Sequence, residues 1–223
     1  MPDSKSLTLT MCVMMVFSFA CTDSRQHQTA PVDPTASEPT KNSVRPPKVE
    51  NTMLLAQATN NMLDSLRLNT YTGNTDLDFL HILKKHQLAA LEMYQTVMSK
   101  GESVELKTIA QNISDHLKMD MDLLDKQVAN TNVQEKSDFS EKALMLLDSL
   151  TVNGLSMHGA YLDLDFATMM MQHHQNAIAL ATLYRKYGKN KKLLQFTQKM
   201  IAAHKSDITR LRNWKTKNYP GVS

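Results

Sequence analysis

Cysteine is almost absent from this 223-residue sequence, and both copies stand near the N-terminus. Cys12 falls inside an apolar run and Cys21 directly follows that run. Because no cysteine stands further along, the rest of the chain can form no disulfide among its own residues. It also offers no thiol for nucleophilic catalysis.

Glycine, proline and aromatic residues are scarce as well, with 6 Gly, 7 Pro and 6% aromatics, whereas methionine is abundant at 16. The apolar-periodic stretches are filled by Leu, Met, Ala, Gln and Lys, and β-branched runs are missing. This composition favours helices, and no strand is expected. The length suits one domain with a proper core plus appendages.

A concentrated basic surface and the common catalytic motifs are also missing. The formal net charge of +3 is spread along the chain, and no basic block with interleaved aromatics indicates nucleic-acid binding. No phosphate-binding loop, dinucleotide glycine pattern, nucleophile elbow or His-Glu-x-x-His is present. None of the seven histidines beyond residue 50 follows a Glu by three positions, as di-iron bundles require. We therefore expect a protein that is not an enzyme.

The N-terminal apolar run predicts export. Lys5 precedes a run from about Leu7 to Ala20, which is shorter than the roughly 20 residues of a membrane-spanning helix. A positive flank, a short apolar segment and a small residue are typical of a signal peptide, here residues 1–20. The end of the run resembles a bacterial lipobox, which predicts lipidation of Cys21. The alternative is an ordinary signal peptide cut nearby.

The segment that follows, residues 21–50, is polar and proline-rich. It cannot bury enough apolar surface to offset its ordering entropy, and it predicts a flexible tether behind the lipid. The expected location is the bacterial cell envelope, facing the periplasm or the surface. Contact with the membrane would then be made through the lipid anchor only.

An internal repeat organises the remainder of the chain. Asp76-Leu77-Asp78-Phe79 recurs as Asp163-Leu164-Asp165-Phe166, and Leu63-Asp64-Ser65-Leu66 recurs as Leu147-Asp148-Ser149-Leu150. Further matches join His86 to His173, Gly101 to Gly188 and, with one residue of slippage, His116 to His204. The sequence thus predicts two helical repeats, 51–130 and 138–217, that form one domain together.

Each repeat predicts a short helix followed by a helical hairpin. The short helices cover about 52–68 and 138–151, and apolar residues at three- and four-residue spacing mark two long helices in each unit. Gly101 and Gly188 would end the first long helix of each pair, and Asp163 would be an N-cap. Short connections make the paired helices antiparallel. The fold class expected is all-α: a four-helix bundle from two duplicated hairpins, each preceded by a short helix.

Histidine and methionine gather in the long helices. His86, His116, His173 and His204 take equivalent places in the alignment, and His174 adjoins His173. Met169, Met170 and Met200 each precede a histidine by four positions, so each pair shares a helix face. Asp207 stands one turn beyond His204. Imidazole with thioether selects Cu(I), whereas imidazole alone also suits Cu(II), Zn, Ni or Fe. Binding would weaken below pH about 6.5, where free imidazole protonates.

Two simpler interpretations stay open beside a metal site. Methionine at helical spacing fills core gaps, and a buried histidine can hydrogen-bond a neighbour. The chain would then be a helical interaction module without metal, its histidines in a buried polar network. Gln87 stands where His174 stands in the second unit, so no duplicate site is expected. His81 and His158 fall outside the matched set.

The second unit resembles a known family. Asp163-Leu164-Asp165-Phe166-Ala167-x-Met169-Met170-x-x-His173-His174 and the later stretch Met200–Ile208 are similar to the signatures of domain of unknown function 305, an exported, ferritin-like helical family of bacteria. The resemblance implies copper binding in the cell envelope. It carries over as ligands Met170, His173, His174 and His204, with Asp165 and Asp207 in support. Leu180 replaces a usual Met, and His204 replaces a usual Gln.

The expected function is therefore that of an exported lipoprotein that binds copper and buffers or chaperones it. Another imidazole-binding transition metal is the second choice. The metal ion is the expected partner, and the sequence leaves open an envelope protein or a second copy of the chain.

Overall fold

The computed structural model of the protein describes residues 49–128, 136–154, 159 and 161–222. The predicted signal peptide, the predicted lipidation site Cys21 and almost all of the predicted tether lie outside these residues. Six helices are present: α1 Val49–Arg67, α2 Thr75–Lys100, α3 Val104–Val128, α4 Phe139–Gly154, α5 Leu162–Tyr187 and α6 Lys191–Asn218. No strand occurs in the described part, so the all-α prediction is confirmed. None of the described helices is long and apolar enough to cross a membrane.

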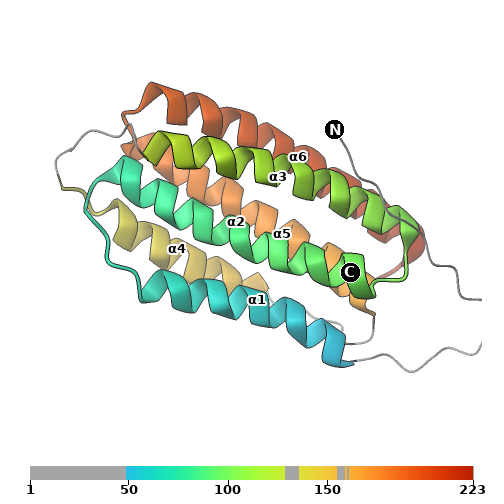
Figure 1. Cartoon of the computed structure of the whole chain (residues 1–223). Helices are drawn as coiled ribbons and strands as arrows, with labels where there is room; N and C mark the ends of the chain where they lie inside the picture. The colour runs from blue at the N-terminus through green and yellow to red at the C-terminus, as the bar shows by residue number, and fades with distance from the viewer. Residues whose placement is uncertain (1–48, 129–135, 155–158, 160, 223) are drawn as a thin grey trace, which may run out of the picture. The chain divides into compact units, whose positions relative to one another are not determined.

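The helices pack as three layers of two (Figure 1). α1 lies beside α4, α2 beside α5, and α3 beside α6, while α2 contacts α1 and α3 and α5 contacts α4 and α6. The pair α2 and α5 is therefore covered on both faces. Each of these helices buries a broad face and leaves one stripe toward solvent, which includes Leu88 and Glu92 on α2 and Gln175 and Thr182 on α5. The two short helices complete the enclosure. A ferritin-like relationship stays a prediction.

The two repeats keep one register throughout their hairpins. α5 begins and ends 87 positions after α2, at Leu162 against Thr75 and at Tyr187 against Lys100, and α6 begins 87 positions after α3. Buried positions follow the same offset: Leu106 with Leu193, Ala110 with Thr197, Ile113 with Met200 and Leu117 with His204. The one-residue slip that aligned His116 with His204 is therefore wrong. His116 stands one position off the buried stripe of α3 and is exposed.

The start of α5 also differs from its prediction. Tyr161, not Asp163, is the N-cap of α5, and its side chain makes no capping hydrogen bond. Asp163 lies inside the first turn, where its carboxylate accepts the backbone N–H groups of Glu102 (3.1 Å) and Ser103 (2.7 Å). The residue thus fastens the turn between α2 and α3 to the second repeat, because its charged carboxylate accepts two N–H groups of that turn.

Gly188 ends α5 as predicted. Glycine is needed there because a side chain has no room, not because of the backbone conformation, since its φ is an ordinary −70°. A Cβ there would overlap the ring of Tyr184, which stacks on Phe79 at 4.0 Å and donates a 2.5 Å hydrogen bond to Asp76. We expect Gly188→Ala to destabilise the fold by about 1–3 kcal/mol because this ring must move. Urea unfolding measures the change. Lys189→Ala, at the exposed neighbouring position, is the control, and an equal effect of both would contradict the explanation.

Candidate metal centre

Two apolar clusters fill the interior and are separated by polar side chains. On α5 one cluster ends at Met170 and the other begins at Leu180; on α6 one ends at Met200 and the other begins at Leu211. On α2 the clusters adjoin at Ala89 and Ala90. Of the buried polar residues at these junctions, eight His, Thr, Gln and Asn side chains form what we call the polar layer: Thr59, His86, Gln87, Thr151, His173, His174, Asn176 and His204.

The four histidines of the polar layer form a continuous chain of rings. His86 stacks on His173 with centroids 3.7 Å apart, His173 lies 6.3 Å from His174, and His174 lies 4.5 Å from His204. His86 and His173 are equivalent positions of the two repeats and touch each other. The histidine group therefore lies where the repeats meet, with one member from the first and three from the second.

Most nitrogens of the four histidine rings have no hydrogen-bond partner in the described structure. Both nitrogens of His86 and of His174 and the Nδ1 of His204 are buried and unpaired, and so are both amide atoms of Gln87. An unpaired buried polar atom costs about 1–3 kcal/mol, so native proteins rarely keep several together. A hydrogen-bonded network of these rings is not what the structure contains. The lone pairs are available to a ligand instead.

Burial keeps these imidazoles neutral. Desolvation, with a smaller effect from His204, lowers the pKa of His86 to about 3, and desolvation lowers that of His204 to about 4. The pKa values of His173 and His174 fall well below 6.5 for the same first reason, with the neighbouring histidines adding to the shift. Neutral imidazole is the form that binds metal. Proton competition, which the sequence places below pH about 6.5, is thereby moved to lower pH.

The three methionines predicted as ligands flank the polar layer from both sides. Met169 and Met170 belong to one apolar cluster and Met200 to the other, and each is at most 4% exposed. They fill the core, as the simpler interpretation has it, yet each stands one helical turn from a histidine of the layer. Thioether side chains therefore belong to both of the apolar clusters that adjoin the imidazoles.

Three other predicted residues are not members of the ring chain. His116 is exposed on α3, where its charge lowers the otherwise raised pKa of Asp120. Asp207 is 6% exposed, lies 3.8 Å from Arg210, and has a pKa raised by burial and lowered again by Arg210 and His116. Asp165 is fully buried and accepts the N–H of Gly159 (3.1 Å) at the start of α5. His158 lies outside the described residues.

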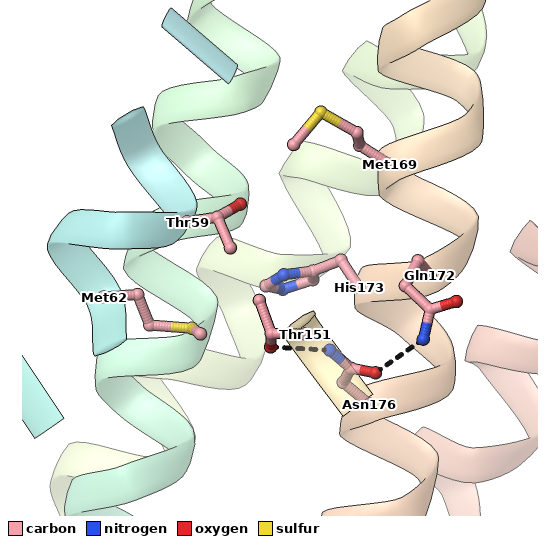
Figure 2. A pocket seen from close by; sticks show the side chains of 7 residues that line it. All are labelled: Thr59, Met62, Thr151, Met169, Gln172, His173 and Asn176. Atoms are coloured by element: carbon pink, nitrogen blue, oxygen red, sulfur yellow. Dashed lines mark hydrogen bonds between the residues drawn. The ribbon is translucent and has the colours of Figure 1, made fainter. Parts of the chain in front are cut away.

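Sequence reasoning missed Met62 and three members of the polar layer, which are Thr59, Thr151 and Asn176. Thr151 accepts a hydrogen bond from the Asn176 amide (3.3 Å), which in turn accepts one from Gln172 (2.9 Å). With Thr59, Met62, Met169 and His173, these residues line a small cavity (Figure 2). In the sequence, single polar residues on otherwise apolar helix faces were the only sign of these positions. Their convergence depends on how α1 and α4 pack, which the sequence does not show.

The ring chain is not a ready-made coordination cage for a hard ion. Among the described residues, no three or more His, Cys, Asp or Glu side chains are placed to hold a metal ion together. Zinc in proteins takes four such ligands and calcium takes six or more oxygens. A soft ion that accepts thioether sulfur beside imidazole matches the donors better.

Comparison with known proteins places these observations in a family. The profile described as "Domain of unknown function (DUF305)" matches residues 76–215. CopM in its silver-bound form is 20% identical, with 68% of this chain and 99% of that chain covered and a TM-score of 0.50. CopM in the Cu(I)-bound form (19%, 67% and 99%, TM-score 0.49) and a DUF305 fragment from Deinococcus radiodurans (14%, 64% and 96%, TM-score 0.49) are also similar. No curated protein matches the chain. At these identities the likeness is one of fold.

Proposed function

The chain belongs to the DUF305 family, and we propose that it binds a soft monovalent metal ion, copper(I) first, and buffers or hands on that ion in the cell envelope. The observation that carries this proposal is the pair His174 and His204. Their rings lie 4.5 Å apart, are buried and neutral, and keep unpaired nitrogens. We assign the ion to these two imidazoles, with Met170 and Met200 one turn away as sulfur ligands.

Copper(I) is preferred to other metals because of the donor types. Thioether and neutral imidazole suit a soft ion, whereas the described residues offer no group of three or more His, Cys, Asp or Glu side chains placed to hold a metal ion. The silver-bound form of CopM, which shares the fold, supports the choice, since silver(I) is also monovalent and soft. The surrounding apolar clusters would exclude water and so protect the bound ion.

Binding without catalysis is the role that we propose. The sequence carries no phosphate-binding loop, nucleophile elbow or His-Glu-x-x-His. Export and lipidation at Cys21 would place the domain in the envelope, behind a flexible tether. These parts of the proposal derive from the sequence.

Thermal unfolding with and without copper(I), under anaerobic reducing conditions, tests the function. The chain should carry Cys12→Ser and Cys21→Ser, because thiolates bind copper(I) themselves. A ligand that binds only the folded state stabilises it by about 2.7 kcal/mol at 100 times its Kd. We expect a saturable rise of the midpoint, absent from His174→Leu/His204→Leu and retained in the exposed control His116→Leu. A midpoint that copper(I) leaves unchanged would favour the interaction module.

A further inference from the structure

The cavity beside His173 lies between α1, α4 and α5. Its volume is about 20 Å³, which is room for one water-sized particle. Figure 2 shows the His173 ring directed from α5 toward Thr59 and Thr151, with Met169 on one side and Met62 on the other. A single bare metal ion is the size of ligand that such a space admits.

The wall of this cavity combines soft donors with neutral polar groups. Met62 and Met169 contribute thioether sulfurs and His173 contributes an imidazole, while no charged side chain lines it. The Asn176 amide is engaged with Thr151 and Gln172. Two sulfurs and one neutral nitrogen form a donor set for a soft monovalent ion, and the uncharged wall gives a hard cation no counter-charge.

The cavity also marks the side on which the ring chain comes closest to solvent. His173 is 8% exposed, against 0% for His86, 1% for His174 and 5% for His204. From His173 the rings of His86 (3.7 Å) and His174 (6.3 Å) lead inward. An ion that reaches His173 therefore meets the row of imidazoles between His86 and His174, with His204 beyond His174.

We propose that this cavity is the entry port for the metal ion, where Met62 and Met169 receive a soft monovalent ion and pass it to His173. The inference rests on the proposed function and adds a route to it. Met62 belongs to α1, which precedes the matched residues 76–215. One of the port's two sulfur-bearing residues thus lies outside the part of the chain that the family profile matches. No bond is made or broken except those between ion and ligand.

The rate of copper(I) uptake tests the port. The Cys12→Ser, Cys21→Ser chain is mixed with a coloured copper(I) chelate; the decay of its absorbance gives the loading rate and the end point gives the affinity. Met62→Leu keeps the volume and removes one sulfur. We expect loading to slow about fivefold or more, with the affinity within about twofold, because a capture ligand is lost and the inner site is kept. Met93→Leu, buried in the other cluster and outside the cavity, is the control.

A second variant guards against an indirect effect of losing Met62. Thr59→Leu fills the cavity and leaves every sulfur and nitrogen in place, and it should slow loading in the same way. Unchanged loading in both variants would overturn the port. A weaker affinity with an unchanged rate would also overturn it, because Met62 would then hold the stored ion. A parent chain that takes no copper(I) at all would instead refute the proposed function, and the port with it.

Discussion

Lowering the pH from 7 to 5 is expected to remove most of the stability of the metal-free protein. The pKa values of the four buried histidines are lowered from 6.5, to about 3 for His86 and about 4 for His204 and well below 6.5 for His173 and His174. The unfolded chain therefore binds more protons than the folded one below pH about 6.5. Stability is fully present above that pH and falls as the pH drops toward the folded pKa values.

The loss of stability is large because four histidines contribute to it. A histidine that stays neutral in the fold but is protonated in the unfolded chain lowers the free energy of unfolding by up to about 2 kcal/mol at pH 5. Four such histidines together remove several kcal/mol, a large part of the about 5–15 kcal/mol that stabilises a typical domain. Helical circular dichroism in a urea series at each pH measures it. His86→Leu should make the dependence on pH shallower, and the exposed His116→Gln should not. A free energy of unfolding that is constant from pH 7 to pH 5 would contradict burial of neutral histidines.

Replacing His174 and His204 together by leucine is expected to stabilise the metal-free protein and abolish its response to copper(I). The unpaired ring nitrogens of these residues are a cost that apolar side chains do not have, and their removal should add about 2–4 kcal/mol. Leucine fits the place, since Leu117 occupies the position equivalent to His204 and is 4% exposed. Urea unfolding without metal and thermal unfolding with copper(I) give the two readouts.

The opposite signs separate the two functional hypotheses. If the histidines formed a hydrogen-bonded network, both replacements would break bonds, and the metal-free protein would lose stability. If the His174→Leu/His204→Leu variant is less stable than the parent without metal, this would therefore contradict a metal site whose unpaired nitrogens destabilise the metal-free fold. His116→Leu, on the outer face of α3, should change neither readout by much.

The sequence was sufficient to predict the helices because their signals are local. Apolar spacing, the glycines at 101 and 188 and the recurring Asp-Leu-Asp-Phe all act within one or two turns, and the resulting helices match the expected ranges closely. The register of the second hairpin helix was harder. Matching His116 to His204 paired identical residue types. In the structure, however, equivalent positions of the two repeats share burial, and the buried residue equivalent to His204 is Leu117.

The rest of the site depends on contacts between helices that the sequence does not specify. The stack of His86 on His173 requires α2 and α5 to meet at the middle of the layers, and the cavity at His173 requires α1 and α4 to cover α5. Asp163 shows the same limit. It has the residue type and place of an N-cap, yet its carboxylate binds the turn before α3.

Nitrogen-15 NMR of the imidazole rings during titration with silver(I) tests the central claim most directly, because each ring reports its own protonation and ligation. We expect four histidines to be neutral at pH 6, and the nitrogens of His174 and His204 to shift with saturation as silver(I) is added. His81 and His116 serve as internal references and should shift little. Two results would contradict the metal centre: silver(I) shifts only the signals of His81 and His116, or the four buried rings become protonated near pH 6.5.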